Sequence, residues 1–588
     1  MRTIRHKTFT ARLTHLYHPD HKYEEGNENR IKKYSSLEFQ TMVRGKSPCT
    51  MDVVCAVGRT RFIENTSRDD TKEEIYQKYG LTISTGTISN YALEFLIRFE
   101  MYHYRHFNRL VDAIEKDGGY ILGVDGTGDG GSDRILLLMD LLEGWALSCG
   151  IIPSEKEMYI TPFFDDLIDR AGNPLAYVRD MGGGLRKAGD NLPPGIPTKE
   201  CDFHFTRDVG KDMMTDNYQK LRKIMVRLNV RSDLVKLRKA LNHNAKSNDI
   251  DLRMMIRSLK ENKVVDDIKA VILTETYHVI SWILNYNEES HHQRFPYSLP
   301  WVYLYRRCNQ GMGVVSEILS TGSIANINTD YIKKTQEIIE RPFHNETATV
   351  ITDLENCIEK SHELFLELRK ILRIPEGKGD IPRDQLFITD EEALEVEEEL
   401  KKFRDRLSAA VENGTNTPGE KIMLDHLIRH WNWLLIPNIS VIVNGEKKKV
   451  AIPRAISLAD ARFSQVKRGI RKRTGKKDTK YELNRYGAPL CLIQNLHSDE
   501  YVEVMFGSMK HLPAALGSIP KEEVEKAMTK FRDAQCRYDI TGARGEREFE
   551  VITNICKKVR EDVESSTIEK SSQPLLVTCD EISIPTDS

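Results

Sequence analysis

One block of this sequence is patterned like a β-sheet, whereas nearly every later window is patterned like a helix, and this contrast constrains the fold most. Short apolar runs separated by charged or glycine-rich turns are typical of strands, and they lie at 120–124, 134–139, 145–152 and 175–178. A helical pattern at 159–170 precedes the last of these runs, and a further strand-like piece ends at 201–204. The order predicts an antiparallel meander followed by helix, strand, helix or loop, and strand, which is an α/β unit.

A long helical region divides the chain. From about residue 209 to 435 the apolar spacing is helical almost throughout, which predicts an all-α insertion into the α/β unit. The chain has 588 residues, more than one hydrophobic core usually covers. We expect an N-terminal helical region, a first part of the core, the insertion, a second part of the core, and C-terminal helices with a disordered tail. Their expected bounds are 1–115, 116–208, 209–435, 436–515 and 516–588.

Charge and cysteine content exclude several classes of protein. The net charge is −2, so any surface for a polyanion has to come from local segregation of charge. The 10 cysteines include no C-x-x-C pair, which argues against a zinc ribbon and against a secreted disulfide framework. No apolar run reaches membrane-spanning length, and the first residues lack the apolar segment of a signal peptide. We therefore expect a cytoplasmic protein without a membrane partner.

Residues 71–99 have the outline of a helix-turn-helix. Thr71 is a candidate N-cap, Gly80 breaks the first helix, and a second amphipathic helix is expected to begin near residue 85. Two interpretations stay open: an ordinary helical hairpin, and a DNA-recognition unit whose second helix contacts DNA with its first residues. Those residues are Thr85, Thr87, Ser89 and Asn90.

Two aspartates stand where apolar strands end beside glycines. Asp125 precedes Gly126, and Asp180 is followed by three glycines at 182–184. A rigid strand fixes a carboxylate, and the missing side chains leave room for an ion and a phosphate. Aspartate and glycine also form ordinary turns, so each motif alone is weak. If the two strands are neighbours in one sheet, both carboxylates lie at the same edge and can bridge a divalent ion.

The ordered set of motifs resembles a family of DNA enzymes. Asp125-Gly-Thr127, Asp180 with its glycines, and Cys201-Asp-Phe-His204 follow one another as in Mutator-like and related bacterial or archaeal DDE transposases. The resemblance covers roughly residues 71–507. It implies an RNase H-like α/β core with a mixed five-stranded sheet, interrupted by the all-α insertion. It also implies that the first acid lies on the first strand, the second after the fourth, and the third on a later helix.

The third acid is expected ahead of a basic helix. The related proteins carry Asn-Asn-x-x-Glu before a helix that ends in Arg-Thr-Gly, and this chain has that ending at 473–475. Counting back from it puts Asp460 in the place of the glutamate, with Ile456 and Ser457 where the asparagines would be. Asp125, Asp180 and Asp460 are therefore predicted to be the catalytic residues and metal ligands. Aspartate is one methylene shorter than glutamate, and the missing asparagines leave open that this copy is decayed.

Positive charge gathers after Asp460, which would place phosphate-binding side chains beside the metal site. The residues predicted to bind DNA there are Lys467, Arg468, Arg471, Lys472 and Arg473. Cys201 and His204 are donors that zinc prefers, but two ligands do not make a closed tetrahedral site. Their role is open between shaping the active site, holding DNA, and plain packing.

The resemblance implies a complete reaction. Such a transposase uses two Mg²⁺ or Mn²⁺ ions to cleave double-stranded DNA at transposon ends and to join the freed 3′-hydroxyl to target DNA. It also implies a homodimer on paired DNA ends and association with the nucleoid. Two alternatives remain: a catalytically decayed transposase that only binds DNA, and an RNase H-like nuclease without strand transfer.

Overall fold

The computed structural model describes most of the chain. The described residues are 2–3, 7–8, 23–24, 27–31, 41–42, 47–128, 133–261, 267–290, 294–325, 327–375, 385–541, 553–554 and 557–558. The end of the predicted disordered tail lies outside them. Within the described residues, no helix is both long enough and apolar enough to cross a lipid bilayer.

A five-stranded mixed sheet forms the centre of the α/β part, as the sequence predicts. Its strands are β5 (Ile121–Thr127), β6 (Arg134–Asp140), β7 (Ala146–Ile152), β8 (Ala176–Arg179) and β9 (Thr198–Glu200). The spatial order is β7-β6-β5-β8-β9. The first three strands in the chain pair antiparallel, whereas β8 runs parallel to β5 and β9 runs parallel to β8. The predicted meander and the predicted mixed sheet are thus confirmed.

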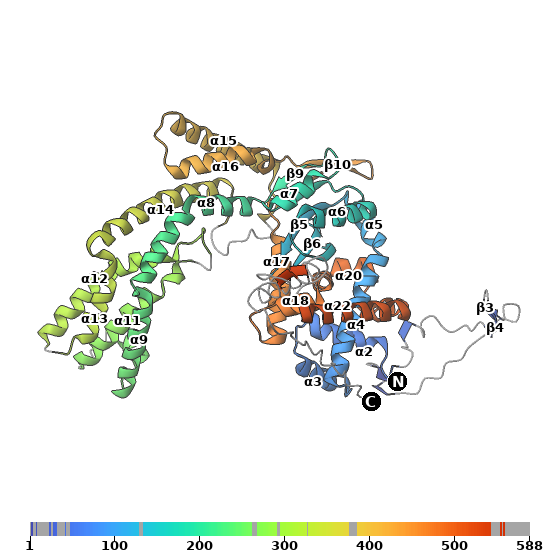
Figure 1. The fold of residues 1–588 in the computed structure, drawn as a ribbon, viewed down its shortest axis with the longest axis horizontal. Helices are drawn as coiled ribbons and strands as arrows, with labels where there is room; N and C mark the ends of the chain where they lie inside the picture. Colours follow the sequence, from blue (N-terminus) through green and yellow to red (C-terminus); the bar gives the residue numbers. More distant parts are fainter. Residues whose placement is uncertain are drawn as a thin grey trace, which may run out of the picture.

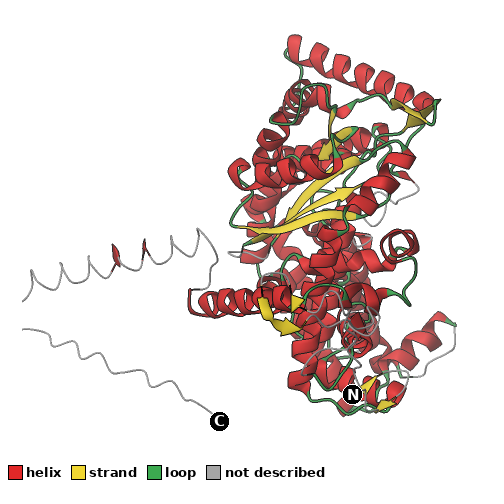
Figure 2. Ribbon diagram, turned by 90° about the vertical axis from the view of Figure 1, so that its right-hand side faces the viewer, coloured by secondary structure: helices red, strands yellow, loops and turns green. Residues whose placement is uncertain are grey.

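The strands are buried on both faces, so helices have to cover the sheet on both sides. In β6 every residue after Arg134 is buried, and the first five residues of β5 are buried as well. Figure 2 shows helices above and below the sheet. Two of these are α6 (Glu157–Ala171), which packs on β7, and α17 (Ser457–Thr474), which packs on β5. The short α7 (Gly183–Asp190) connects β8 to β9 and packs on α6.

The N-terminal region consists of α2 (Met51–Phe62), α3 (Arg68–Tyr79), α4 (Thr85–Arg105) and α5 (Asn108–Asp117). The first three pack on one another. The first helix of the predicted helix-turn-helix begins at Arg68 rather than Thr71, because Ser67 is the N-cap and accepts from the Asp70 N–H. Gly80 ends it in the left-handed conformation at φ 65°, as expected. The described residues before these helices include the short strands β1 (Arg2–Thr3), β2 (Lys7–Thr8), β3 (Tyr23–Glu24) and β4 (Asn27–Ile31).

A long helical arm follows β9 and extends away from the sheet (Figure 1). Its helices are α8 (Asp202–Arg227), α9 (Val230–Ser247), α10 (Leu252–Lys260), α11 (Ile268–Leu284), η1 (Tyr286–Ser290), α12 (Pro300–Ile324), α13 (Asp330–Glu340), η2 (Arg341–Phe343), α14 (Asn345–Ile371), α15 (Asp390–Glu412) and α16 (Pro418–Leu434). The expectation of a strand ending at 201–204 is wrong in part. The strand stops at Glu200, and Cys201 is the N-cap of α8.

The chain then returns to the sheet. The hairpin β10 (Ile439–Val443) and β11 (Glu446–Val450) forms a separate two-stranded sheet. Its turn residues Asn444 and Gly445 have φ of 52° and 83°, as the Asn-Gly signal predicts. After α17 the helices are α18 (Lys480–Tyr486), α19 (Pro489–Leu492), η4 (Ile493–His497), α20 (Asp499–Phe506), α21 (Leu512–Gly517) and α22 (Lys521–Thr541).

Candidate active site

Three separate elements carry the three predicted acids to one place. Asp125 lies in β5, and Asp180 directly follows β8. The parallel register pairs Val124 with Arg179, so Asp125 and Asp180 are the next residues along two neighbouring strands. Asp460 lies in the first turn of α17, the helix that packs on β5. Strand pairing thus joins the first two acids, and helix packing brings the third.

The three carboxylates are close enough for their charges to act on one another. The Asp125 side chain is only 6% exposed. Burial raises the pKa of Asp125 well above its usual value, and the negative charges of Asp460 and Asp180 raise that pKa further. The Gly126 N–H donates to Oδ1 of Asp125 at 2.8 Å, and this hydrogen bond lowers the pKa of Asp125. The site therefore concentrates negative charge in a poorly solvated place.

Asp180 sits in a more mixed environment. Burial raises the pKa of Asp180, while the Gly182 N–H, which donates to Oδ1 at 2.7 Å, lowers it. The charge of Arg207 also lowers this pKa, and that of Asp208 raises it. Both of these residues belong to α8, so the first helix of the arm contributes charge beside Asp180.

A fourth carboxylate, Glu155, lies beside the first two acids. It is in the turn between β7 and α6, and it pairs with Arg134 at 2.8 Å. Burial raises the pKa of Glu155, the charge of Arg134 lowers it, and the charge of Asp180 raises it. Glu155 in turn raises the pKa of Asp125. Sequence reasoning missed Glu155 because neither a strand end nor a glycine marks its position.

The glycines of both acid motifs make room for the Glu155 turn. A Cβ atom on Gly126 would lie 2.5 Å from Oε1 of Glu155, and one on Gly184 would lie 1.7 Å from the Glu155 carbonyl oxygen. Both distances are too short for real atoms. The close approach of the Glu155 backbone thus requires a glycine at 184, whereas the Gly126 contact is with the end of a flexible side chain and nothing lies within 4 Å of a Cβ atom on Gly183.

Buried ion pairs fix the backbone beneath Asp180. Nη2 of Arg179 donates to Oε1 of Glu200 at 2.9 Å, and Oε2 of Glu200 bonds to Nδ1 of His430 at 2.7 Å. Nη1 of Arg179 also donates to the Asp180 carbonyl oxygen at 3.0 Å. Removal of one partner from such a buried set is costly because the other charge is left without compensation. The network therefore holds β8, β9 and α16 in one arrangement behind the second acid.

A second buried pair ties both ends of the arm to the segment before α17. Nζ of Lys199 donates to Oδ1 of Asp202 at 2.8 Å and to the Leu434 carbonyl oxygen at 2.6 Å. The Asp202 N–H donates to the Arg454 carbonyl oxygen at 2.9 Å. The start of α8, the end of α16 and the chain leading to Asp460 therefore share one anchor.

Cys201 and His204 are both buried and occupy the junction of α8 with α17. The backbone N–H groups of His204 and Ile456 donate to the Cys201 sulfur, and burial raises the pKa of this thiol to about 12. Burial lowers the pKa of His204 to about 3, so its imidazole is neutral near pH 7. Because Ile456 is the N-cap residue of α17, the Cys201 thiol positions the helix that carries Asp460.

The basic residues after Asp460 divide into two groups. Arg468, Arg471 and Lys472 are exposed on α17, where solvent or DNA can reach them. Arg473 is buried: its guanidinium lies 5.0 Å from the Phe62 ring centroid and donates to Asn65 at 2.8 Å. We therefore correct the expectation that Arg473 binds DNA, because this side chain instead packs α17 against α2.

Lys467 reaches the end of the strand that carries Asp125. Its Nζ donates to Oγ1 of Thr127 at 2.8 Å, which joins α17 to the end of β5. Lys467 is half-buried, so it differs from the exposed basic residues that follow it. The structure thus places Lys467 at the end of β5, and its predicted role in binding DNA stays a prediction.

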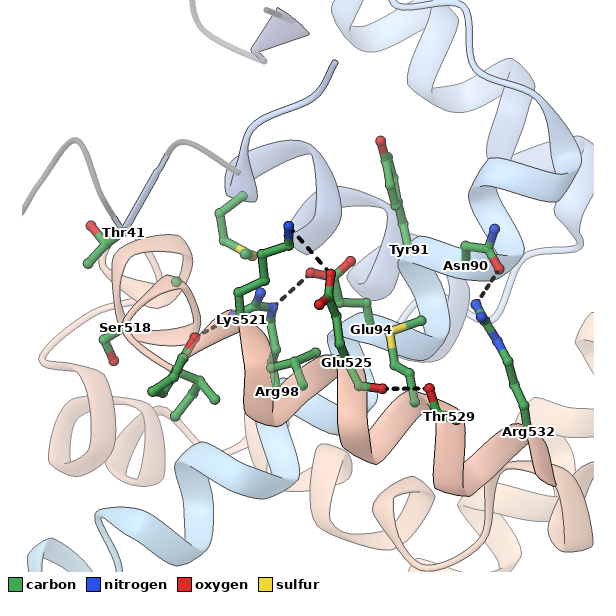
Figure 3. A pocket seen from close by; sticks show the side chains of 16 residues that line it. Thr41, Asn90, Tyr91, Glu94, Arg98, Ser518, Lys521, Glu525, Thr529 and Arg532 are labelled. Carbon is green, nitrogen blue, oxygen red and sulfur yellow. Dashed lines mark hydrogen bonds and ion pairs between the residues drawn. The ribbon is translucent and has the colours of Figure 1, made fainter. Parts of the chain in front are cut away.

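The start of α4 is partly accessible, and α22 lies across it (Figure 3). The half-exposed Thr87 and Ser89 bond locally, Thr87 to the Ser84 cap and Ser89 to the Thr85 carbonyl oxygen. Asn90 accepts from Arg532 of α22 at 3.3 Å. A cavity of about 840 Å³ separates the two helices and is lined by residues of both. Asn90 is exposed despite this bond, and Thr85, Thr87 and Ser89 are half-exposed, so all four predicted residues remain near the surface.

The acids fit Mg²⁺ or Mn²⁺, because both ions prefer carboxylate oxygens as ligands. The repulsion between the negatively charged carboxylates also favours binding of a cation. Over the described residues, no three His, Cys, Asp or Glu side chains form a cluster tight enough to hold one ion. The charges of Asp180 and Asp460 nevertheless act on Asp125. Charges act over longer distances than those between a metal ion and its ligands, so this effect is compatible with the lack of a tight cluster.

Two comparisons with known proteins returned no relative. No family model matches this chain, and no curated protein matches it significantly. The function of the chain is therefore inferred from its own residues and their geometry.

Proposed function

We propose that this chain is a DDE-type transposase that cleaves DNA at the ends of a mobile element and joins the freed 3′-hydroxyl to target DNA. The observation that carries the proposal is the meeting of Asp125, Asp180 and Asp460 from three separate elements. Enzymes that transfer phosphoryl groups with two metal ions place carboxylates from different elements around one site in this way.

The order of the strands supports the same proposal. In the transposases that the sequence resembles, the first acid lies on the first strand of an RNase H-like core, the second after the fourth strand, and the third on a later helix. Here β5 is the first strand of the sheet in chain order and β8 is the fourth. Asp125, Asp180 and Asp460 therefore stand at the corresponding places, and the helical arm occupies the place of the insertion.

In the proposed reaction the chain positions the groups that react. Asp125, Asp180 and Asp460 would hold the divalent ions. When bound, these ions would lower the pKa of the attacking water and stabilise the leaving 3′-oxygen. Glu155 adds negative charge beside Asp125, and Lys467 fixes α17 on β5. Buried ion pairs hold these elements still, as transition-state stabilisation by preorganised groups requires.

Two surfaces are proposed for DNA. Arg468, Arg471 and Lys472 on α17 are exposed within the helix that carries Asp460, so they would neutralise backbone phosphates near the cleavage point. Thr85, Thr87, Ser89 and Asn90 at the start of α4 would contact the element ends, which gives the helix-turn-helix its recognition role. Base contacts supply sequence preference, whereas the α17 cations supply affinity that salt weakens.

The test is a cleavage and joining assay with purified protein, Mn²⁺, and a labelled duplex taken from the DNA that flanks the gene. We expect cleavage followed by strand transfer, and loss of both in Asp125→Ala, Asp180→Ala and Asp460→Ala. Asp169→Ala, at an exposed position of α6, is the control and should react like the unmodified protein. Cleavage without joining would indicate a nuclease, and DNA binding without cleavage would indicate a decayed transposase.

A further inference from the structure

A groove of about 290 Å³ lies next to Asp180, on the side of the helical arm. It is formed where α7, α8 and α16 meet, and Met181, the residue after Asp180, lines one end. Asp208 also lines the groove, and its charge raises the pKa of Asp180. The groove and the second acid therefore share an electrostatic environment, although the groove is separate from the three acids.

Most charged side chains of the groove already have partners. Lys211 pairs with Asp208 at 3.2 Å, and His426 bonds to Asp212 at 2.9 Å. The ring of His430 bonds to the buried Glu200 at 2.7 Å. These pairs fix the walls of the groove. Because the paired charges compensate one another, they attract a charged ligand only weakly.

Two arginines differ from the rest. Arg186 of α7 and Arg429 of α16 line the same groove, and within the described part of the chain neither guanidinium has an ion pair or hydrogen bond. Guanidinium groups bind phosphate oxygens through two parallel hydrogen bonds, so two arginines on one groove match a phosphodiester. The groove is smaller than most small-molecule pockets, which also favours a backbone phosphate over a larger ligand.

We propose that Arg186 and Arg429 bind one backbone phosphate of the DNA strand whose scissile bond lies at Asp125, Asp180 and Asp460. This inference rests on the proposed function and extends it by naming the path of that strand away from the acids. The strand runs past Met181 and between α7 and α16, so the helical arm guides DNA in addition to supporting the core. Phosphate contacts of this kind fix register and orientation without reading sequence.

The test measures DNA binding without cleavage. Fluorescence anisotropy with a labelled duplex, in EDTA and over a range of salt concentrations, is compared for the unmodified protein and for the double variant Arg186→Gln/Arg429→Gln. We expect affinity to fall on the order of tenfold and the slope of log K against log salt to drop by about 1, as for one lost phosphate contact. The melting temperature should stay unchanged because neither guanidinium holds another element in place.

The matched control is Arg253→Gln/Arg257→Gln on α10, which packs on α11 in the part of the arm that Figure 1 shows away from the sheet. Both control arginines are exposed, so the same charge is lost at another site. Unchanged binding in the groove variant, or an equal loss in the control, would overturn the proposal. Cleavage by the unmodified protein is scored separately, so weakened binding without any cleavage would refute only the transposase function.

Discussion

Nζ of Lys467 donates to Oγ1 of Thr127 at 2.8 Å, so the helix that carries Asp460 is fastened to the strand that carries Asp125. The two residues are far apart in the sequence, and their bond closes the site between the first and third acids. The donor is a cation, so positive charge lies at the end of β5, two residues beyond Asp125 in the same strand. This contact leads directly to a test of how the third acid is positioned.

Thr127→Val should slow DNA cleavage about tenfold while leaving the protein folded. The substitution keeps the shape of the side chain but removes the acceptor of the Lys467 bond, and hydrogen bonds to charged groups contribute about 1.5–3 kcal/mol. Single-turnover cleavage at saturating Mn²⁺ measures the effect. Thr474→Val, which removes a bond from the hydroxyl to the Ile470 carbonyl at the other end of α17, is the control. Equal slowing in both variants would mean that Thr127 does not position the acids.

Asp125→Asn should stabilise the metal-free protein at neutral pH and abolish cleavage. The folded-state pKa of Asp125 lies above its unfolded value, so the folded state binds more protons between the two pKa values. Asp125 therefore lowers stability increasingly as pH rises through that window, and the amide removes this penalty. A gain of about 1 kcal/mol would raise the melting temperature of a chain of 588 residues by roughly 1 °C.

Thermal melts at pH 4 and pH 8 measure this difference. The stabilisation by Asp125→Asn should be larger at pH 8 than at pH 4, because pH 4 lies at the start of the window between the unfolded and folded pKa values, where little of the penalty has developed. A variant that is less stable than the unmodified protein at pH 8 would show that Asp125 is not under electrostatic strain.

Glu155→Gln should raise the Mn²⁺ concentration needed for half-maximal cleavage several-fold, which corresponds to a loss of Mn²⁺ binding free energy on the order of 1 kcal/mol. The cleavage rate at saturating Mn²⁺ should change little. Glu155 adds negative charge beside Asp125 and Asp180, and its loss weakens attraction for a cation without removing a predicted ligand. Metal titrations of the cleavage rate give the result. Glu157→Gln, two residues along the chain, serves as the control, and a similar shift there would contradict a specific role for Glu155.

Gly184→Ala and Gly183→Ala form a matched pair on adjacent residues. A Cβ atom at Gly184 would meet the Glu155 carbonyl oxygen at 1.7 Å, whereas nothing lies within 4 Å of one at Gly183. We expect Gly184→Ala to cost about 1–3 kcal/mol of stability and most of the activity, since backbone has to move beside Asp180. Gly183→Ala should be nearly neutral. Melting temperatures and cleavage rates of the two variants measure the difference. Equal values for both variants would show that the Glu155 carbonyl oxygen does not lie close to Gly184.

Arg473→Gln and Arg471→Gln should separate packing from DNA binding. Arg473 is buried over Phe62, and burial lowers its pKa to about 10, so its loss should cost about 3 kcal/mol of stability. Arg471 is exposed, and its loss should weaken DNA binding a few-fold with no change in melting temperature. Melts and anisotropy titrations on both variants measure the two effects. A melting temperature unaffected by Arg473→Gln would restore it as a candidate for DNA contact.

Local sequence signals were enough for the secondary structure around the acids. Alternation and turn residues predicted the strands that became β5, β6, β7 and β8, because these patterns depend on near neighbours only. The Asn444-Gly445 turn and the Gly80 helix end were likewise predictable, since both need left-handed backbone that asparagine and glycine adopt readily. The start of α8 was misjudged because apolar residues at 201–205 do not distinguish a strand end from a buried helix start.

The sequence by itself determined which residues are candidates for the proposed chemistry: acids at strand ends with glycines beside them, and a basic helix after a third acid. Only the tertiary structure decided how they meet, because strand pairing puts Asp180 beside Asp125 and the packing of α17 on β5 brings in Asp460. Tertiary contacts also decided which basic side chains are buried and which further carboxylate lies near the acids. Arg473 and Arg471 are alike in sequence, yet one packs on Phe62 and the other faces solvent, and Glu155 reaches the acids from a turn that no motif marks. Such differences depend on contacts between distant parts of the chain, which local patterns do not contain.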